Sequence, residues 1–226
     1  MKTLAIDTST RQGSLALFQG DELVLAQWLD PTLPTTQVIT PALKQLVDEA
    51  GWKPAELELI AVAQGPGSFT GLRIGVMTAK TIAYVASATT IGVNTLQAIS
   101  ARCSENVSRL HVVMDAQRNE LFHALYQWNE SGTYQELAET RIVDRDIFLE
   151  SLVPGESITG PGLKNRHQQV PEGVRVVDES YWQPSAEAVG RVGLGQFRSG
   201  ISHDFWKLNP IYYRKSAAEE KLETQG

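Results

Sequence analysis

The chain has 226 residues, 42% of them hydrophobic and 20% charged, so it can bury a sizeable core as one compact unit or two small lobes. Its net charge of −6 provides no basic field for a phosphate backbone, which argues against RNA binding by this chain alone. The single cysteine, Cys103, excludes an internal disulfide. With no secretory h-region at the start and no apolar run long enough to span a membrane, we expect a cytoplasmic protein without membrane contact.

The first half of the chain is typical of three strands followed by alternating helices and strands. Three apolar runs, the last two joined by the turn "QGDE", predict strands at 2–9, 13–18 and 22–29. From Val38 the apolar residues recur with a 3.6-residue period up to Gly51, which predicts a helix with Pro41 tolerable only in its first turn. A further strand, helix, strand and helix are predicted at 57–65, 71–88, 89–93 and 95–103.

The second half repeats this order in part. Apolar runs predict three strands, then a helix, two short strands and a closing helix weakened by internal glycines, at 109–116, 120–128, 135–143, 145–152, 157–160, 174–177 and 185–200. Two βββαβα units placed face to face predict an α/β fold of the duplicated ribonuclease-H-like type seen in actin, sugar kinases and heat-shock chaperones. The expected division is an N-terminal lobe at 1–104 and a C-terminal lobe with a tail at 105–226, with a cleft between the lobes.

An aspartate ends the first strand of each half, Asp7 in one and Asp115 in the other. Facing each other across the cleft, the two carboxylates could hold a magnesium-bound nucleotide, as in a small-molecule kinase that uses ATP. The alternative is structural, because each carboxylate can instead bond the backbone of its own turn. The glycines of "TGPGLKNR", Gly160 and Gly162, could likewise lie beside a nucleotide or simply form a turn, which we favour.

The stretch "GPGSFTGLRIG" at 65–75 fails the known phosphate and nucleophile templates. Its last loop glycine, Gly71, is followed by Leu72 and Arg73 where a Walker loop needs Lys and Ser or Thr. The glycine spacing misses the dinucleotide fingerprint, and no histidine or acid lies nearby to activate Ser68 as a nucleophile. The loop is therefore expected to be architectural, with Ser68 or Thr70 capping the helix that follows.

Four small residues recur every four positions along that helix and leave one face almost bare: Gly71, Gly75, Ala79 and Ala83. Such a face allows close approach of another helix, because the distance between helix axes depends on the side chains at the contact. It could equally pack against the protein's own sheet. Both interpretations are open from the sequence.

The four histidines, His111, His123, His167 and His203, are scattered along the chain. The spacing of the first two places them on neighbouring strands, and we expect core or surface roles for all four. Without two histidines one helical turn apart, no zinc or iron site is predicted.

Five segments in sequence resemble one protein family: "LAIDTST", "GPGSFTGLRIG", "IGVNTL", "MDAQRNELFHALY" and "PIYYR". They are similar to the corresponding segments of the bacterial TsaB family, also called YeaZ, and the match runs over most of the chain. One departure is Thr35, since some relatives carry a histidine just before the first helix.

The resemblance implies a non-catalytic partner in tRNA modification. TsaB-like proteins are similar in fold to TsaD, which attaches a threonylcarbamoyl group to adenosine 37 of tRNA (t6A), and they bind TsaD together with the ATPase TsaE. Partner contact would use the first two helices, including Leu43 and Leu46 in one and the bare face of the other. It further implies a homodimer when alone, tRNA contact only through the complex, no tightly bound cofactor, and ATP or ADP at most at the complex interface.

Overall fold

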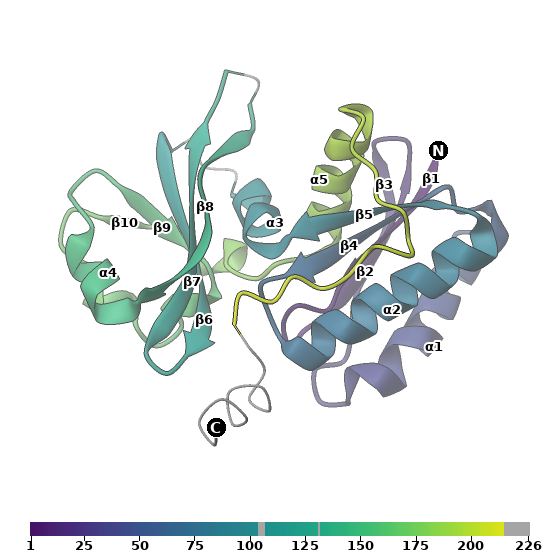
Figure 1. Cartoon of the computed structure of the whole chain (residues 1–226), viewed down its shortest axis with the longest axis horizontal. Coiled ribbons are helices and arrows are strands. Elements are labelled where there is room, and N and C mark those ends of the chain that lie inside the picture. Colours follow the sequence, from purple (N-terminus) through teal and green to yellow (C-terminus); the bar gives the residue numbers. More distant parts are fainter. Residues whose placement is uncertain (104–106, 131, 215–226) are drawn as a thin grey trace.

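The computed structural model describes residues 1–103, 107–130 and 132–214. The described chain forms two lobes that lie next to each other, each built on one five-stranded mixed sheet (Figure 1). The predicted tail beyond residue 214 lies outside the described residues.

The first sheet contains an antiparallel meander continued by two parallel strands, in the order β3-β2-β1-β4-β5. β1 pairs antiparallel with β2 and parallel with β4, and its alternating side chains are buried on both faces. The strands are β1 (Lys2–Asp7), β2 (Ser14–Gln19), β3 (Glu22–Trp28), β4 (Leu59–Gly65) and β5 (Thr89–Asn94).

The second sheet repeats this topology, in the order β10-β9-β6-β7-β8. β6 takes the place of β1, since it pairs antiparallel with β7 and parallel with β9. The strands are β6 (Arg109–Gln117), β7 (Glu120–Trp128), β8 (Tyr134–Asp144), β9 (Ser157–Thr159) and β10 (Arg175–Val176). The predicted duplication is thereby confirmed at the level of the sheets.

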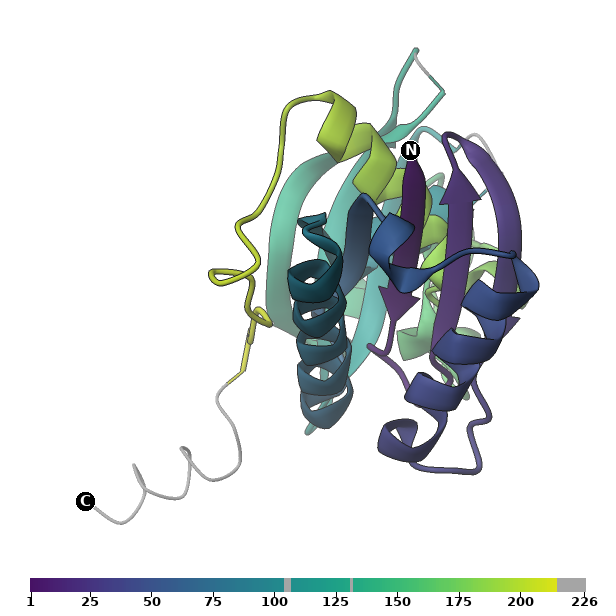
Figure 2. The same cartoon turned by 90° about the vertical axis from the view of Figure 1, so that its right-hand side faces the viewer.

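Two helices, α1 (Thr35–Glu49) and α2 (Phe69–Ala86), lie side by side on one face of the first sheet (Figure 2). The amphipathic period of α1 buries Ile39 and Leu46 in the core beneath it. α1 begins at Thr35, so Pro41 lies in its second turn. The sequence had predicted that this proline could be tolerated only in the first turn. The proline lies on the exposed side of the helix.

The opposite face of the first sheet is covered by α5 (Ala186–Arg198), with α3 (Thr95–Arg102) beside it. Val189 and Leu194 of α5 pack in one cluster with Phe18 of β2 and Ala61 of β4. The predicted division at residue 104 is therefore wrong for the end of the chain, because α5 returns to the first lobe. Its glycines explain the close fit: a Cβ on Gly190 would lie 2.2 Å from the Phe18 ring.

The second lobe differs from the predicted βββαβα unit in one connection. α4 (Arg145–Ser151) follows β8 as expected, but the described chain between β9 and β10 forms only short 3-10 turns, Pro161–Leu163 and His167–Gln169. Within the described parts of both lobes, every helix is too short or too polar to cross a membrane.

Candidate functional site

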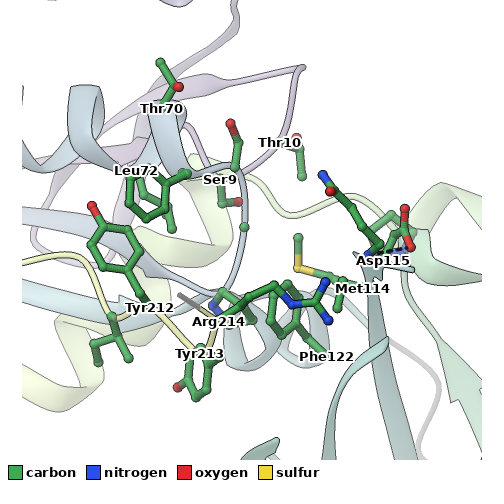
Figure 3. A pocket seen from close by; sticks show the side chains of 18 of the residues that line it. Ser9, Thr10, Thr70, Leu72, Met114, Asp115, Phe122, Tyr212, Tyr213 and Arg214 are labelled. Carbon is green, nitrogen blue, oxygen red and sulfur yellow. Dashed lines mark hydrogen bonds between the residues drawn. The ribbon is translucent and has the colours of Figure 1, made fainter. Parts of the chain in front are cut away.

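A cleft of about 680 Å³ lies between the lobes (Figure 3). It is lined from the first lobe by the β1–β2 turn and the start of α2, and from the second lobe by the β6–β7 turn. The extended segment that follows α5 contributes Ile211, Tyr212, Tyr213 and Arg214. The walls thus combine hydroxyl, aromatic and cationic side chains from widely separated parts of the sequence.

The loop "GPGSFTGLRIG" forms one wall, and its glycines are needed for close backbone approach. Gly67 has a φ of 156°, and a Cβ there would lie 2.4 Å from the Ser9 carbonyl oxygen. The Ser68 amide donates to that same oxygen at 2.7 Å. The Ser68 hydroxyl accepts from the Gly71 amide at 3.2 Å, which confirms the predicted helix cap.

The bare face of α2 packs inside its own lobe. Gly71, Gly75, Ala79 and Ala83 are all buried. A Cβ on Gly71 would lie 2.0 Å from the Thr8 carbonyl oxygen, and one on Gly75 would lie 2.2 Å from the Thr8 hydroxyl. Their prediction as partner-binding residues is therefore corrected, because the β1–β2 turn occupies the space that a partner helix would need.

The two predicted leucine contacts on α1 are also turned inward. Leu46 is 2% exposed and lies in the core of the first lobe, while Leu43 is half-buried against the same cluster. The amphipathic stripe that marks a helix in the sequence is its core-facing side, so the residues of that stripe are the ones least available to a partner. The opposite side of α2 carries the exposed apolar side chains Met77, Tyr84 and Val85.

Asp7 does not face the cleft. Its carboxylate is completely buried, and Oδ1 accepts from both the amide and the hydroxyl of Ser9, at 2.9 and 2.6 Å. Burial raises the pKa of this carboxyl, against the lowering effect of the Ser9 bonds. The predicted nucleotide-facing role is corrected in favour of the turn-forming alternative.

Asp115 does line the cleft, but its charge is already paired. Arg145 of α4 donates to Oδ1 at 2.7 Å, and the amide of Gln117 donates to the same oxygen at 3.1 Å. Of the two predicted carboxylates only Asp115 faces the cleft, so the two do not face each other across it as the predicted magnesium-bound nucleotide site requires.

Gly160 and Gly162 form the turn that the sequence favoured. Gly160 has a φ of 114°, and a Cβ there would lie 2.2 Å from the Val113 carbonyl oxygen. Gly162 packs closely on the Met114 backbone, and only Pro161, between the two glycines, lines the cleft. Neither glycine faces a nucleotide-sized space.

The β6–β7 turn carries backbone strain that the sequence did not reveal. Gln117, Arg118 and Asn119 have φ values of 64°, 53° and 61°, a conformation that costs each non-glycine residue free energy. The Asn119 side chain donates to Asp146 at 2.7 Å and its carbonyl accepts from the Arg145 amide at 2.8 Å. Contacts to α4 therefore hold the strained turn against the cleft.

The first two histidines lie on neighbouring strands, as predicted. His111 Nδ1 and His123 Nε2 are 2.9 Å apart, and His111 Nε2 lies 3.3 Å from Glu156 Oε1. Burial lowers the pKa of both rings, that of His123 to about 3. Among the described residues no group of three or more His, Cys, Asp or Glu side chains has the arrangement of a metal site.

Comparison with known proteins identifies the family. The model of the TsaD family, tRNA N6-adenosine threonylcarbamoyltransferase, matches residues 35–160. The tRNA threonylcarbamoyladenosine biosynthesis protein TsaB of Escherichia coli K12 is 30% identical over 228 residues, which cover 98% of both chains. The chain belongs to the TsaB family.

Further TsaB relatives agree with this assignment. TsaB of Bacillus subtilis is 32% identical over 150 residues, 66% of this chain and 63% of that protein. YeaZ from Pseudomonas aeruginosa superposes with a TM-score of 0.80 over 93% of this chain and 99% of its own, at 23% identity, which supports the same fold. The resemblance inferred from the five segments is confirmed.

Proposed function

We propose that this TsaB-family chain is a non-catalytic subunit that binds a TsaD-like transferase and supports formation of t6A in tRNA. The observation that carries the proposal is the outward side of α2, which exposes three apolar side chains, one of them, Tyr84, beside Phe205 and Trp206 of the segment that follows α5. Met77, Tyr84 and Val85 are 59%, 65% and 65% exposed. Helix faces with exposed apolar side chains are typical of interaction surfaces.

The position of this surface also favours a partner large enough to contact both α1 and α2. α1 and α2 lie side by side on the outside of the first lobe, so together they present a broad helical surface away from the cleft (Figure 2). The inward sides of both helices are used by the core of the lobe. A partner would therefore contact the outward sides without rearranging the fold.

The cleft supports a role without catalysis. Its carboxylate, Asp115, is bound to Arg145, and the carboxylate of Asp7 is buried away from it. A kinase of this fold would need free acids beside the nucleotide. The alternative activity, ATP-dependent phosphorylation of a small molecule, has only Asp115 of the two predicted carboxylates at the cleft.

The remaining partners of the proposed function follow from the family resemblance. A TsaE-like ATPase would join the complex, ATP or ADP would bind at its interface, and tRNA would be reached through the complex. Without the transferase, two copies of this chain would pair through the same helices. The acidic net charge of −6 fits a subunit that leaves the tRNA backbone to its partner.

Charge substitution on the outward side of α2 tests the docking surface. Met77→Glu combined with Tyr84→Glu should weaken association with a TsaD-like transferase by about tenfold or more, since interface anchors each contribute on the order of 1 kcal/mol or more. Ile147→Glu on α4, which alters a side chain that is 70% exposed on the other lobe, is the matched control. Calorimetric titration of all three proteins, with melting curves to verify folding, makes the measurement; equal affinity of all three would refute docking here.

Turnover by the isolated chain separates the scaffold from the kinase. We expect negligible ATP hydrolysis and no phosphate transfer, and Asp115→Asn should leave t6A synthesis by the reconstituted complex within about twofold of normal. ATP turnover by the isolated chain that is lost in Asp115→Asn would establish the kinase instead.

A further inference from the structure

The segment that follows α5, residues 203–214, crosses the first lobe and reaches the second lobe; we call it the strap (Figure 1). Its beginning is attached to the edge of the first sheet, where the His203 amide donates to the Thr90 carbonyl at 2.8 Å. Leu208 is 2% exposed within the core of that lobe, and the Ile211 amide donates to the Gln64 carbonyl at 2.7 Å. The strap is thus fixed to the first lobe at several points.

Side chains of α2 hold the strap from the other side. Lys80 donates to the Trp206 and Leu208 carbonyls at 3.2 and 3.1 Å. The ring of Tyr212 stacks on Phe69 with centroids 4.1 Å apart, and the Tyr212 hydroxyl accepts from Arg73 at 2.9 Å. Up to Tyr212 these contacts all lie within the first lobe.

The last two described residues of the strap contact the second lobe. Arg214 forms an ion pair with Glu120 of β7, and the Tyr213 ring lies edge to face with Phe122 of β7, 6.1 Å between centroids. Asn94, at the end of β5, donates to the Tyr213 hydroxyl at 3.1 Å. Figure 3 shows Arg214 extending from the strap toward Phe122 and Met114 across the bottom of the cleft.

We propose that the strap is a latch that fixes the angle between the two lobes and prevents the cleft from opening. The chain passes between the lobes after α3 and before α5, and α3 also packs Leu96 and Ile99 into the core of the second lobe. The strap adds a further connection, at the cleft. Opening the cleft would separate Arg214 from Glu120 and Tyr213 from Phe122, because the rest of the strap is held on the first lobe. The ion pair is partly buried, with side chains 21% and 35% exposed, so water screens it less than a surface pair.

The latch goes beyond the proposed function and does not depend on it. Two-lobed proteins commonly close around a ligand by hinge motion. A chain whose lobes are fastened across the cleft instead presents one rigid surface. The latch therefore gives the two lobes and the cleft a structural role, although Asp115 is paired and Asp7 is buried.

Distance measurements between the lobes test the latch. Spin labels at Lys44→Cys on α1 and Glu150→Cys on α4, both exposed positions, report the angle between the lobes when Cys103 is replaced by alanine. Tyr213→Ala with Arg214→Ala should raise the population of wider distances about tenfold, as expected for the loss of one partly buried ion pair and one aromatic contact. Tyr212→Phe, which loses only a bond within the first lobe, is the matched control and should leave the distances unchanged.

A charge exchange guards against a double-alanine variant that fails to fold. Arg214→Glu alone should widen the distance distribution, and adding Glu120→Arg should narrow it again. If neither the double-alanine variant nor Arg214→Glu widens the distribution, or if the exchange does not restore it, the latch is refuted.

Discussion

The two lobes share a sheet topology but differ in the connection after the fourth strand. After β4 the chain turns at Gly67 and continues as α2, whereas after β9 it turns at Gly160 and forms only short 3-10 turns. In both lobes the glycines let this turn touch the backbone of the neighbouring strand or of the turn next to it. The duplication has therefore been preserved where backbones meet at the cleft, and it has diverged on the outer surface, where the first lobe presents a long helix and the described part of the second does not.

The largest expected effect breaks this shared feature in each lobe separately. Gly67→Ala would place a methyl group 2.4 Å from the Ser9 carbonyl oxygen, and Gly160→Ala would place one 2.2 Å from that of Val113. Backbone atoms cannot move aside cheaply, so each substitution should lower the free energy of unfolding by about 3 kcal/mol. Urea denaturation makes the measurement, and values within about 0.5 kcal/mol of the parent for both would show that the turns tolerate side chains.

A smaller effect is a pH dependence of stability that originates in the second lobe, because among the described residues the buried histidines both lie in the second sheet. Burial lowers the pKa of His123 to about 3 in the folded chain, whereas in the unfolded chain this histidine binds a proton near pH 6.5. The free energy of unfolding therefore has its full value, as far as His123 is concerned, above pH 6.5, and it decreases as the pH falls toward 3. Between pH 7 and pH 5 the loss should be about 2 kcal/mol.

His123→Gln is the control for that titration, since glutamine can still donate to His111 but cannot be protonated. Urea denaturation of both proteins at pH 7 and pH 5 should show a smaller loss in the variant. Parallel losses would mean that other groups cause the pH dependence.

The smallest effect concerns a glycine that close packing does not require, in contrast to the glycines of the two turns. Gly195 lies in α5 with no atom within 4 Å of the position of a Cβ. Gly195→Ala should raise the free energy of unfolding by about 0.5–1 kcal/mol, because alanine favours the helix. Thermal unfolding would detect the gain, and a loss of stability would show that α5 does not tolerate a side chain at this position.

Much of the fold could be predicted because its signals are local. Apolar runs and the 3.6-residue period located the helices and strands, and Ser68 marked the start of α2. The return of α5 to the first lobe could not be predicted, because its partners Phe18 and Ala61 lie more than a hundred residues earlier. The helix glycines were interpreted as a weakness of the helix, while in the structure they allow its close packing.

The candidate site was harder to predict because the type of a residue does not show which way its side chain points. Asp7 is the last residue of β1 and Asp115 lies two residues before the end of β6, but the first is buried whereas the second is exposed and paired. The small residues of α2 fit a partner helix and the protein's own turn equally well, and only the position of Thr8 decides between them. The contact of Arg214 with the second lobe could not be predicted, since nothing near it in sequence points to Glu120.

The return of α5 imposes an order on folding during synthesis. One face of the first sheet, with Phe18 and Ile91, stays without its cover until the ribosome has added α5. The described residues of the second lobe, from 107 to 182, form its sheet and α4 without any later part of the chain. The lobe that begins the sequence is therefore completed last, and a nascent chain that stops before residue 186 exposes an apolar sheet face to aggregation and to chaperones.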